Sequence, residues 1–386
     1  MGSNGGANVP ARGHLRHVEG MRAAAALVVF VNHAYAQVWN PMRDQYPRGV
    51  LSAFSYFLVY GHLSVTVFIV ISGFCLALPV LAAGDQIRGG AKDFFRRRAR
   101  RILPPYYGAL ALCLVLIGTI LGEPTGTIWD VPILVSRASI VSHALLLQDL
   151  YGTGSINYVF WSIAVEWQIY FLFPLLVWSW RRYGPTATVS VALVGGYALL
   201  FAFGATRIAR ANPHFLGMFA LGMAAAYVAK CPREPYLRWR HEFPWRSVAL
   251  ASAAIAGGLI LIWGIATSTT RFHWLDLPVG AMTACILVTE STRTDGIAAR
   301  VFAWKPLAIV GTFSYSVYLI HAPALQLLWL YVIGAADIAP GAKFAFLMTL
   351  GLALVLGAAY LFFRVLEEPF MRPAKPRPVP VPVPNA

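Results

Sequence analysis

The chain has 386 residues, of which 58% are hydrophobic and only 12% are charged, and its mean hydropathy is +0.62. Soluble domains carry roughly 25% charged residues, so this composition excludes an ordinary soluble protein and indicates an integral membrane protein. The net charge of +15 is divided among short segments between apolar stretches, which is typical of cytoplasmic loops and indicates contact with a lipid bilayer, not with nucleic acid.

Apolar stretches recur along the chain, and each is near the ~20 residues that a helix needs to cross a bilayer. We therefore predict an all-α, polytopic membrane protein with a bundle of about ten transmembrane helices. The predicted spans cover residues 22–38, 61–81, 103–122, 158–178, 187–205, 213–229, 247–266, 275–290, 307–330 and 343–366.

The segments outside this bundle are short and polar. We predict a disordered cytoplasmic N-terminus over residues 1–16, one membrane domain over 17–370, and a Pro-rich, extended cytoplasmic tail over 371–386. No cleavable signal peptide is evident. A short re-entrant or interfacial helix is expected around residues 136–150, within the longest non-cytoplasmic loop.

Lys and Arg fall mainly in one alternating set of segments, which holds 24 of the 31 such residues. Positive charge accumulates on the cytoplasmic side, so the pattern predicts that both termini are cytoplasmic. The set comprises the N-terminus, 82–102, 179–186, 230–246, 291–306 and the tail.

The first predicted span carries Arg22 and His33, eleven positions apart. A helix places them on nearly one face, separated by about 16 Å along its axis. Ionisable groups inside a membrane usually mark a functional site, and imidazole transfers protons near neutral pH. The alternative is that Arg22 is a flanking positive charge and His33 an interfacial anchor.

The segment before the third predicted span is the most basic, with five arginines within residues 96–101. Guanidinium groups bind phosphate through two parallel hydrogen bonds, so the cluster suits the phosphates of a nucleotide-like donor such as coenzyme A. Topogenic charge and contact with anionic lipids are the alternatives. We expect the third helix to begin at Leu103-Pro104-Pro105. In the second span, Ser72-Gly73-Phe74 permits close helix packing.

Two later spans carry further polar groups. Glu166 follows Ser162 at i+4, with Trp161 just before them. This carboxylate could orient an imidazole, act as an acid or base, or pair with an arginine as a structural ion pair. In the ninth span a polar stripe suits a hydrogen-bonded substrate or, alternatively, an interhelical polar contact. It consists of Ser314, Tyr318 and His321 at i, i+4 and i+7, with Tyr315 beside them.

These motifs, in this order, resemble the membrane-bound acyltransferase-3 family, the bacterial O-acyltransferases that decorate sugars. The resemblance extends from about residue 16 to residue 370. A mild departure is Ile163-Ala164 where the family more usually has Leu-Ser. The matching motifs are Arg22 with His33; FIVISGF with Ser72; Arg98 and Arg101 before Ile-Leu-Pro; WSIAVEW with Trp161, Ser162 and Glu166; FLGM; and SYSVYLIH with Ser314, Tyr315, Tyr318 and His321.

The resemblance implies transfer of an acyl group, commonly acetyl, from acyl-CoA to a hydroxyl of a saccharide or glycosylated acceptor at the bacterial cytoplasmic membrane. Acyl-CoA is then a substrate, and no permanently bound cofactor or metal is implied. In this family the first-helix Arg and His are held essential, which here are Arg22 and His33, and Arg98 and Arg101 are associated with donor binding. Some members carry an extracytoplasmic esterase-like domain; none is evident in this sequence, so we expect the protein to act alone or with separate envelope-polysaccharide assembly proteins.

We expect His33 to be the general base on the acceptor hydroxyl, with an acyl-histidine intermediate as the mechanistic variant. Arg22 and Glu166 complete the predicted catalytic set, and Ser72 is expected to join Arg98 and Arg101 in the donor site. The residues expected to bind the acceptor are Trp161, Ser162, Ser314, Tyr315, Tyr318 and His321. A transporter or flippase of a polar or lipid-linked solute is the rival hypothesis. Binding of CoA discriminates the two, because a transporter should ignore it.

Overall fold

The computed structural model describes residues 16–43, 45–130, 135–153, 155–204, 206–265, 270–292 and 296–371. Every element with assigned bounds in these ranges is a helix. The predicted N-terminal segment 1–16 and tail 371–386 lie outside the described residues, apart from their boundary positions Arg16 and Met371.

Long helices make up most of the fold. Seven segments in the described parts of the chain are long and apolar enough to cross a membrane, so the protein is an all-α polytopic membrane protein. They are Leu51–Ala82, Gly90–Leu121, Phe160–Phe203, Trp245–Trp263, Phe272–Thr292, Ser314–Ile333 and Pro340–Met371. The first segment contains most of α2 (Val50–Leu58) and all of α3 (Leu63–Ala82). The others correspond to α4 (Gly90–Leu116) with η3 (Ile117–Leu121), α7 (Phe160–Phe203), α11 (Trp245–Trp263), α12 (Phe272–Thr292), and α15 (Ser314–Leu328) with η6 (Trp329–Ile333). The last is the run α16 (Pro340–Phe346), η7 (Leu347–Gly351), α17 (Leu352–Phe362), η8 (Phe363–Glu367) and α18 (Glu368–Met371).

Two further helices lie inside the bundle: α1 (Arg16–Val38), which carries Glu19 and Arg22, and the 16-residue α9 (Phe215–Lys230). Short helices connect the long ones. They are η2 (Pro41–Arg43), α2 (Val50–Leu58), η4 (Ile128–Asp130), α5 (Arg137–Ala144), α6 (Gln148–Tyr151), α8 (Arg207–Arg210), α10 (Tyr236–Glu242), α13 (Ile297–Phe302) and α14 (Lys305–Thr312). The expected helix around residues 136–150 is thus present as α5 and α6.

The ten predicted ranges fall largely on helical segments where the structure describes them, but the ninth is divided. The fourth and fifth ranges correspond to two helices joined across a kink within α7 at Gly184, where φ is +86° and Pro185 follows. The ninth range is divided at Phe313 into α14 and α15. Glycine tolerates the positive φ at this bend because it has no Cβ.

The expected start of the third helix at Leu103-Pro104-Pro105 is wrong. The α4 helix begins at Gly90, after Gly89 in the left-handed conformation, so the arginine cluster is helical and both prolines lie inside the helix. Proline removes backbone hydrogen bonds from a helix interior, but packing can override this cost. Here α4 contacts α15 and η8, and the Tyr315 hydroxyl donates to the carbonyl of Ile102 at 3.2 Å.

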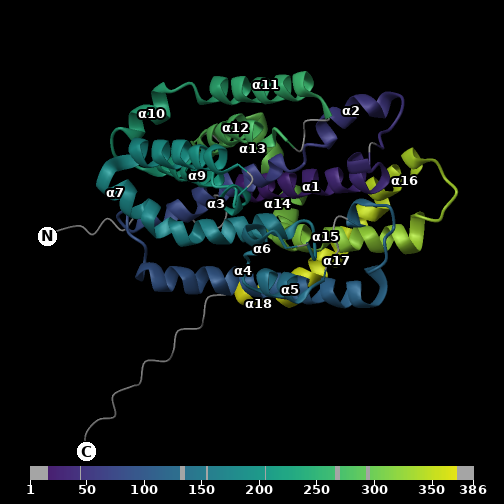
Figure 1. Ribbon diagram of the computed structural model, residues 1–386. Helices are drawn as coiled ribbons and strands as arrows, with labels where there is room; N and C mark the ends of the chain where they lie inside the picture. The colour runs from purple at the N-terminus through teal and green to yellow at the C-terminus, as the bar shows by residue number, and fades with distance from the viewer. Residues whose placement is uncertain are drawn as a thin grey trace, which may run out of the picture.

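The α1 helix runs through the middle of the bundle, with α11 at one edge and α4 at the opposite edge (Figure 1). It contacts α3, α13, α14 and α15. Beside it, α3 and α9 pack closely: a Cβ at Gly73 would lie 2.0 Å from the carbonyl oxygen of Phe219, and one at Gly222 would lie 1.9 Å from that of Val70. The packing role expected for Gly73 is therefore confirmed, and it fixes the wall that carries Ser72.

Candidate active site

Two cavities lie within the bundle and share a boundary. The first, of about 110 Å³, is lined by Arg22, Arg98 and Arg101 among others, and we call it the arginine cavity. The second, of about 700 Å³, is lined by His33, and we call it the histidine cavity. Tyr318 lines both cavities, so it stands where they meet.

The helical periodicity of α4 selects which arginines reach the arginine cavity. Arg98 and Arg101 are three positions apart, share a face and line it, whereas the neighbouring Arg100 is exposed. The Arg98 Nε atom is buried and has no hydrogen-bond partner among the described residues. A buried donor without an acceptor is costly, so this guanidinium is suited to an anionic ligand.

Acidic and hydroxyl groups complete the arginine cavity. The Tyr170 hydroxyl donates to Glu166 Oε1 at 2.5 Å and lies 2.9 Å from the Ser72 hydroxyl. Arg22 Nη1 lies 3.5 Å from Glu19 Oε1, and its Nη2 lies 3.7 Å from the Cys75 sulfur. Glu166 therefore belongs to the same cavity as the arginines, and its direct partner is a tyrosine.

His33 meets a second histidine. Its Nδ1 atom lies 2.7 Å from Nε2 of His321, and the two rings are nearly parallel, with centroids 5.0 Å apart. Nδ1 of His321 lies 2.8 Å from the Tyr318 carbonyl oxygen and 3.1 Å from that of Val317. Carbonyl oxygens only accept hydrogen bonds, so we assign the His321 proton to Nδ1. Its Nε2 then accepts from His33 Nδ1–H, which leaves the Nε2 lone pair of His33 available as a base.

Aromatic and hydroxyl groups position the residues around this pair. The Tyr158 ring lies edge-on to the His33 ring, with centroids 4.8 Å apart. Tyr158 and Trp161 both line the histidine cavity. The Tyr318 hydroxyl lies 2.6 Å from the Ser162 hydroxyl, which joins α15 to α7 at the boundary of the two cavities.

Beyond the histidine pair, a second hydrogen-bonded contact joins α1 to α15, the helices that carry His33 and His321. Gln37, four positions after His33, donates through Nε2 to Oε1 of Gln326 at 2.6 Å. Gln326 also accepts from the Thr127 hydroxyl at 3.0 Å and donates to that of Thr125 at 2.9 Å. Both glutamines are buried. The α1–α15 contact that contains the histidine pair is therefore fixed at two successive levels.

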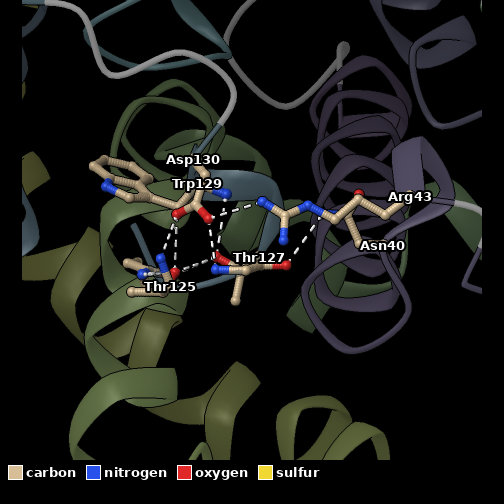
Figure 2. A network of polar contacts seen from close by, with 8 residues as sticks. Asn40, Arg43, Thr125, Thr127, Trp129 and Asp130 are labelled. Carbon is tan, nitrogen blue, oxygen red and sulfur yellow. Dashed lines mark hydrogen bonds and ion pairs between the residues drawn. The ribbon is translucent and has the colours of Figure 1, made fainter. Parts of the chain in front are cut away.

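The loop before η4 is itself held in place (Figure 2). The Asp130 carboxylate accepts from the backbone N–H groups of Thr125 and Gly126 at 2.8 and 2.5 Å, and it lies 3.4 Å from Arg43 Nη2. The Trp129 ring on η4 packs against the Tyr158 ring, with the ring centroids 6.2 Å apart. This network thus supports the aromatic side chain that packs against His33.

Replacing Gln326 with leucine should destabilise the protein, because it leaves the buried Gln37 amide without its partner. We expect a loss of about 1–3 kcal/mol, measured as a lower Tm by intrinsic tryptophan fluorescence in detergent. The double variant Gln37→Leu/Gln326→Leu should lose less than the sum of the two single variants, since neither partner is then left behind. Thr349→Val, at an exposed helical hydroxyl, is the control; additive losses in the double variant would contradict the Gln37–Gln326 contact.

All residues expected at the site line one of the two cavities or contact a residue that does. Ser162, Ser314 and Tyr315 lie with the arginines, so the predicted polar stripe extends from the arginine cavity to His321. Other residues at the site were not expected from the sequence, among them His62, Gln148, Asp149, Tyr158, Tyr170 and Gln326. Of these, only Tyr170 had a sequence signal, because it follows Glu166 at i+4.

Comparison with known proteins identifies the family to which this chain belongs. The family profile described as "Acyltransferase domain", that of the acyltransferase-3 family, matches residues 16–364, which is nearly the whole chain. The chain belongs to the acyltransferase-3 family. The resemblance inferred from the motifs is therefore confirmed, and membership implies an acyl donor.

Curated relatives of the chain are named as O-acetyltransferases. The peptidoglycan O-acetyltransferase OatA of Listeria monocytogenes is 22% identical over 341 residues, which cover 82% of this chain and 50% of OatA. The O-acetyltransferase OatA of Staphylococcus aureus is 22% identical over 335 residues, which cover 81% of this chain and 51% of that protein. This acyltransferase-3 chain thus spans about half the length of the curated relatives it matches. No solved structure matches it.

Proposed function

We propose that this protein transfers an acyl group, most simply acetyl, from acyl-CoA to a hydroxyl of a carbohydrate or glycosylated acceptor. The observation that carries the proposal is the pair of cavities that meet at Tyr318, one lined by Arg98 and Arg101 and the other by His33. Such an arrangement suits a reaction in which an anionic donor and a polar acceptor approach from opposite sides.

On the donor side, Arg98 and Arg101 bind the phosphates of acyl-CoA, and Ser72 lies on the adjoining wall. Arg22 lies about 16 Å from His33 along α1, too far to contact the same atom, so it anchors the donor. Glu166 balances the positive charge of the cavity through its position beside the arginines and its bond to Tyr170.

On the acceptor side, His33 is the general base. Its Nε2 takes the proton of the acceptor hydroxyl while the hydroxyl oxygen attacks the thioester carbonyl. The tetrahedral adduct then expels the thiolate of CoA, which takes the proton back from the His33 imidazolium, so that an ester and CoASH result. His321 acts through His33 as a positioning residue, since its Nε2 accepts the Nδ1–H of that base.

The charges of the loops support one orientation in the membrane. We infer that about ten helices span the bacterial cytoplasmic membrane, with both termini and the arginine cavity on the cytoplasmic side. Acyl-CoA is a cytoplasmic metabolite, so this orientation gives the donor access to Arg98 and Arg101. The histidine cavity then opens toward the opposite face, where saccharides of the cell envelope are located. The name of the Listeria monocytogenes relative, a peptidoglycan O-acetyltransferase, supports such an acceptor.

The direct test is release of CoA from acetyl-CoA by purified protein in detergent, with mass spectrometry of added saccharide pools. We expect CoA release coupled to an acetylated saccharide. A well-folded protein that neither binds CoA nor turns acetyl-CoA over would refute the proposal and favour a transporter.

Arg98→Ala should weaken CoA binding by about 10- to 100-fold, since a charge-assisted hydrogen bond contributes about 1.5–3 kcal/mol. Isothermal titration with CoA measures this change. Arg100→Ala is the matched control, because Arg100 lies on the same helix but is exposed. Equal losses in the two variants would indicate a general charge effect and contradict a specific phosphate site.

A further inference from the structure

Unpartnered polar atoms converge on the histidine cavity. Among the described residues, four buried side-chain nitrogen or oxygen atoms that have no hydrogen-bond partner belong to residues that line this cavity. They are His62 Nε2, Gln148 Oε1, Asp149 Oδ2 and Tyr158 Oη. Buried polar groups in folded proteins are almost always paired, so such a concentration indicates a ligand that supplies the missing partners.

The short helix α6 contributes two of these atoms, and its local contacts fix what they can do. The Gln148 Nε2 group donates to the carbonyl of Phe160 at 3.0 Å, which leaves Oε1 as an acceptor. The next residue, Asp149, offers a carboxylate oxygen. The two neighbouring side chains therefore present acceptors that require hydroxyl or amide donors.

The pKa of the Asp149 carboxyl is consistent with a buried carboxyl oxygen that lacks a hydrogen-bond donor. α6 lies between the spans that end at Leu121 and begin at Phe160, so it is outside the membrane-spanning segments. Burial raises the pKa of the Asp149 carboxyl to about 7. Hydrogen bonds from a bound ligand would offset the cost of removing this carboxylate from water.

We propose that Gln148 and Asp149 form the acceptor-binding subsite of the histidine cavity and that its ligand is a polyhydroxylated ring, as in a saccharide. This inference rests on the proposed function, which it extends by naming the residues that hold the acceptor. The ring hydroxyls donate to the two α6 acceptors, Tyr158 donates to or accepts from a further hydroxyl of the ring, and the indole of Trp161 packs against the apolar face of the ring. One ring hydroxyl is thereby directed to His33, which lines the same cavity.

The size and composition of the cavity support a sugar. Its volume of about 700 Å³ lies within the ~300–1,000 Å³ typical of small-molecule sites. A simple lipid tail would satisfy none of the four unpartnered atoms, and a short alcohol would satisfy only one or two. A ring with several hydroxyls supplies donors and acceptors together.

The test measures saccharide binding without turnover. Purified wild type and Asp149→Asn would be titrated with a panel of neutral, N-acetylated and uronic acid oligosaccharides by saturation-transfer NMR. Asparagine keeps the shape but replaces one acceptor oxygen with a donor, so we expect binding of the preferred saccharide to weaken about tenfold or more. Tyr158→Phe, which removes only the hydroxyl, should weaken it in the same direction. Asp337→Asn, at an exposed aspartate outside the cavity, should bind as the wild type does.

The outcomes separate this inference from the proposed function. Saccharide binding that is equal in wild type and Asp149→Asn, or absent in wild type across the panel, overturns the subsite. Titration of the same samples with CoA reports the donor side independently. Loss of CoA binding in Asp149→Asn would also overturn the subsite, because that result indicates a structural role. Absence of CoA binding in wild type refutes the proposed acyl transfer, while the saccharide titrations still decide the subsite.

Discussion

Replacing His33 with alanine is expected to lower kcat for acyl transfer by about 10²–10⁴-fold, the range that a general base contributes. The variant loses the base that takes the proton from the acceptor hydroxyl. KM for acetyl-CoA should change little, because the arginine cavity lies on the other side of Tyr318. Steady-state CoA release with a saccharide acceptor measures both parameters.

His241→Ala serves as the control, since His241 is an exposed histidine on α10. Thermal unfolding of both variants checks that the bundle remains intact. Near-normal kcat in His33→Ala would end the assignment of this residue as the base. A burst of CoA release from wild type without any acceptor would instead favour the acyl-histidine variant, in which His33 is the nucleophile.

Replacing His321 with alanine should lower kcat by about 10²-fold while KM for acetyl-CoA is unchanged. This residue fixes which nitrogen of His33 carries the proton, and a base in the wrong tautomer presents no lone pair to the substrate. Alanine removes the acceptor at 2.7 Å from His33 Nδ1. The ring of His33 is then free to rotate or to exchange its proton.

Two conservative variants distinguish this positioning role from simple packing. Glutamine places its amide oxygen near the site of the His321 Nε2 atom, whereas asparagine places its oxygen near that of Nδ1. His321→Gln should therefore recover about tenfold or more of the activity lost in His321→Ala, and His321→Asn should recover little. If both variants recover equally, or neither does, the hydrogen bond to His33 is not what His321 contributes.

Local sequence patterns predicted the helices well, because each pattern reports on one element alone. Apolar runs identified the long helices, and the positions of Arg22 and His33 placed both on α1. The spacing of Ser314, Tyr318 and His321 predicted one face of α15, and these residues do follow one another from the arginine cavity to the histidine pair. At Pro104 and Pro105 the local pattern predicted the start of a helix. That prediction was wrong, because packing against other helices keeps both prolines inside α4.

The sequence by itself determined that this is an all-α membrane protein, that it resembles the acyltransferase-3 family, and which polar residues stand out on apolar helices. Only the tertiary structure decided which of these polar residues contact one another. His33 and His321 are 288 positions apart, and no periodicity relates two helices so distant in the chain. Asp149 showed no pattern in the sequence, because its significance comes from burial beside a cavity formed by several elements. Helical periodicity fixes the face on which a side chain lies, whereas its neighbours depend on how whole helices pack.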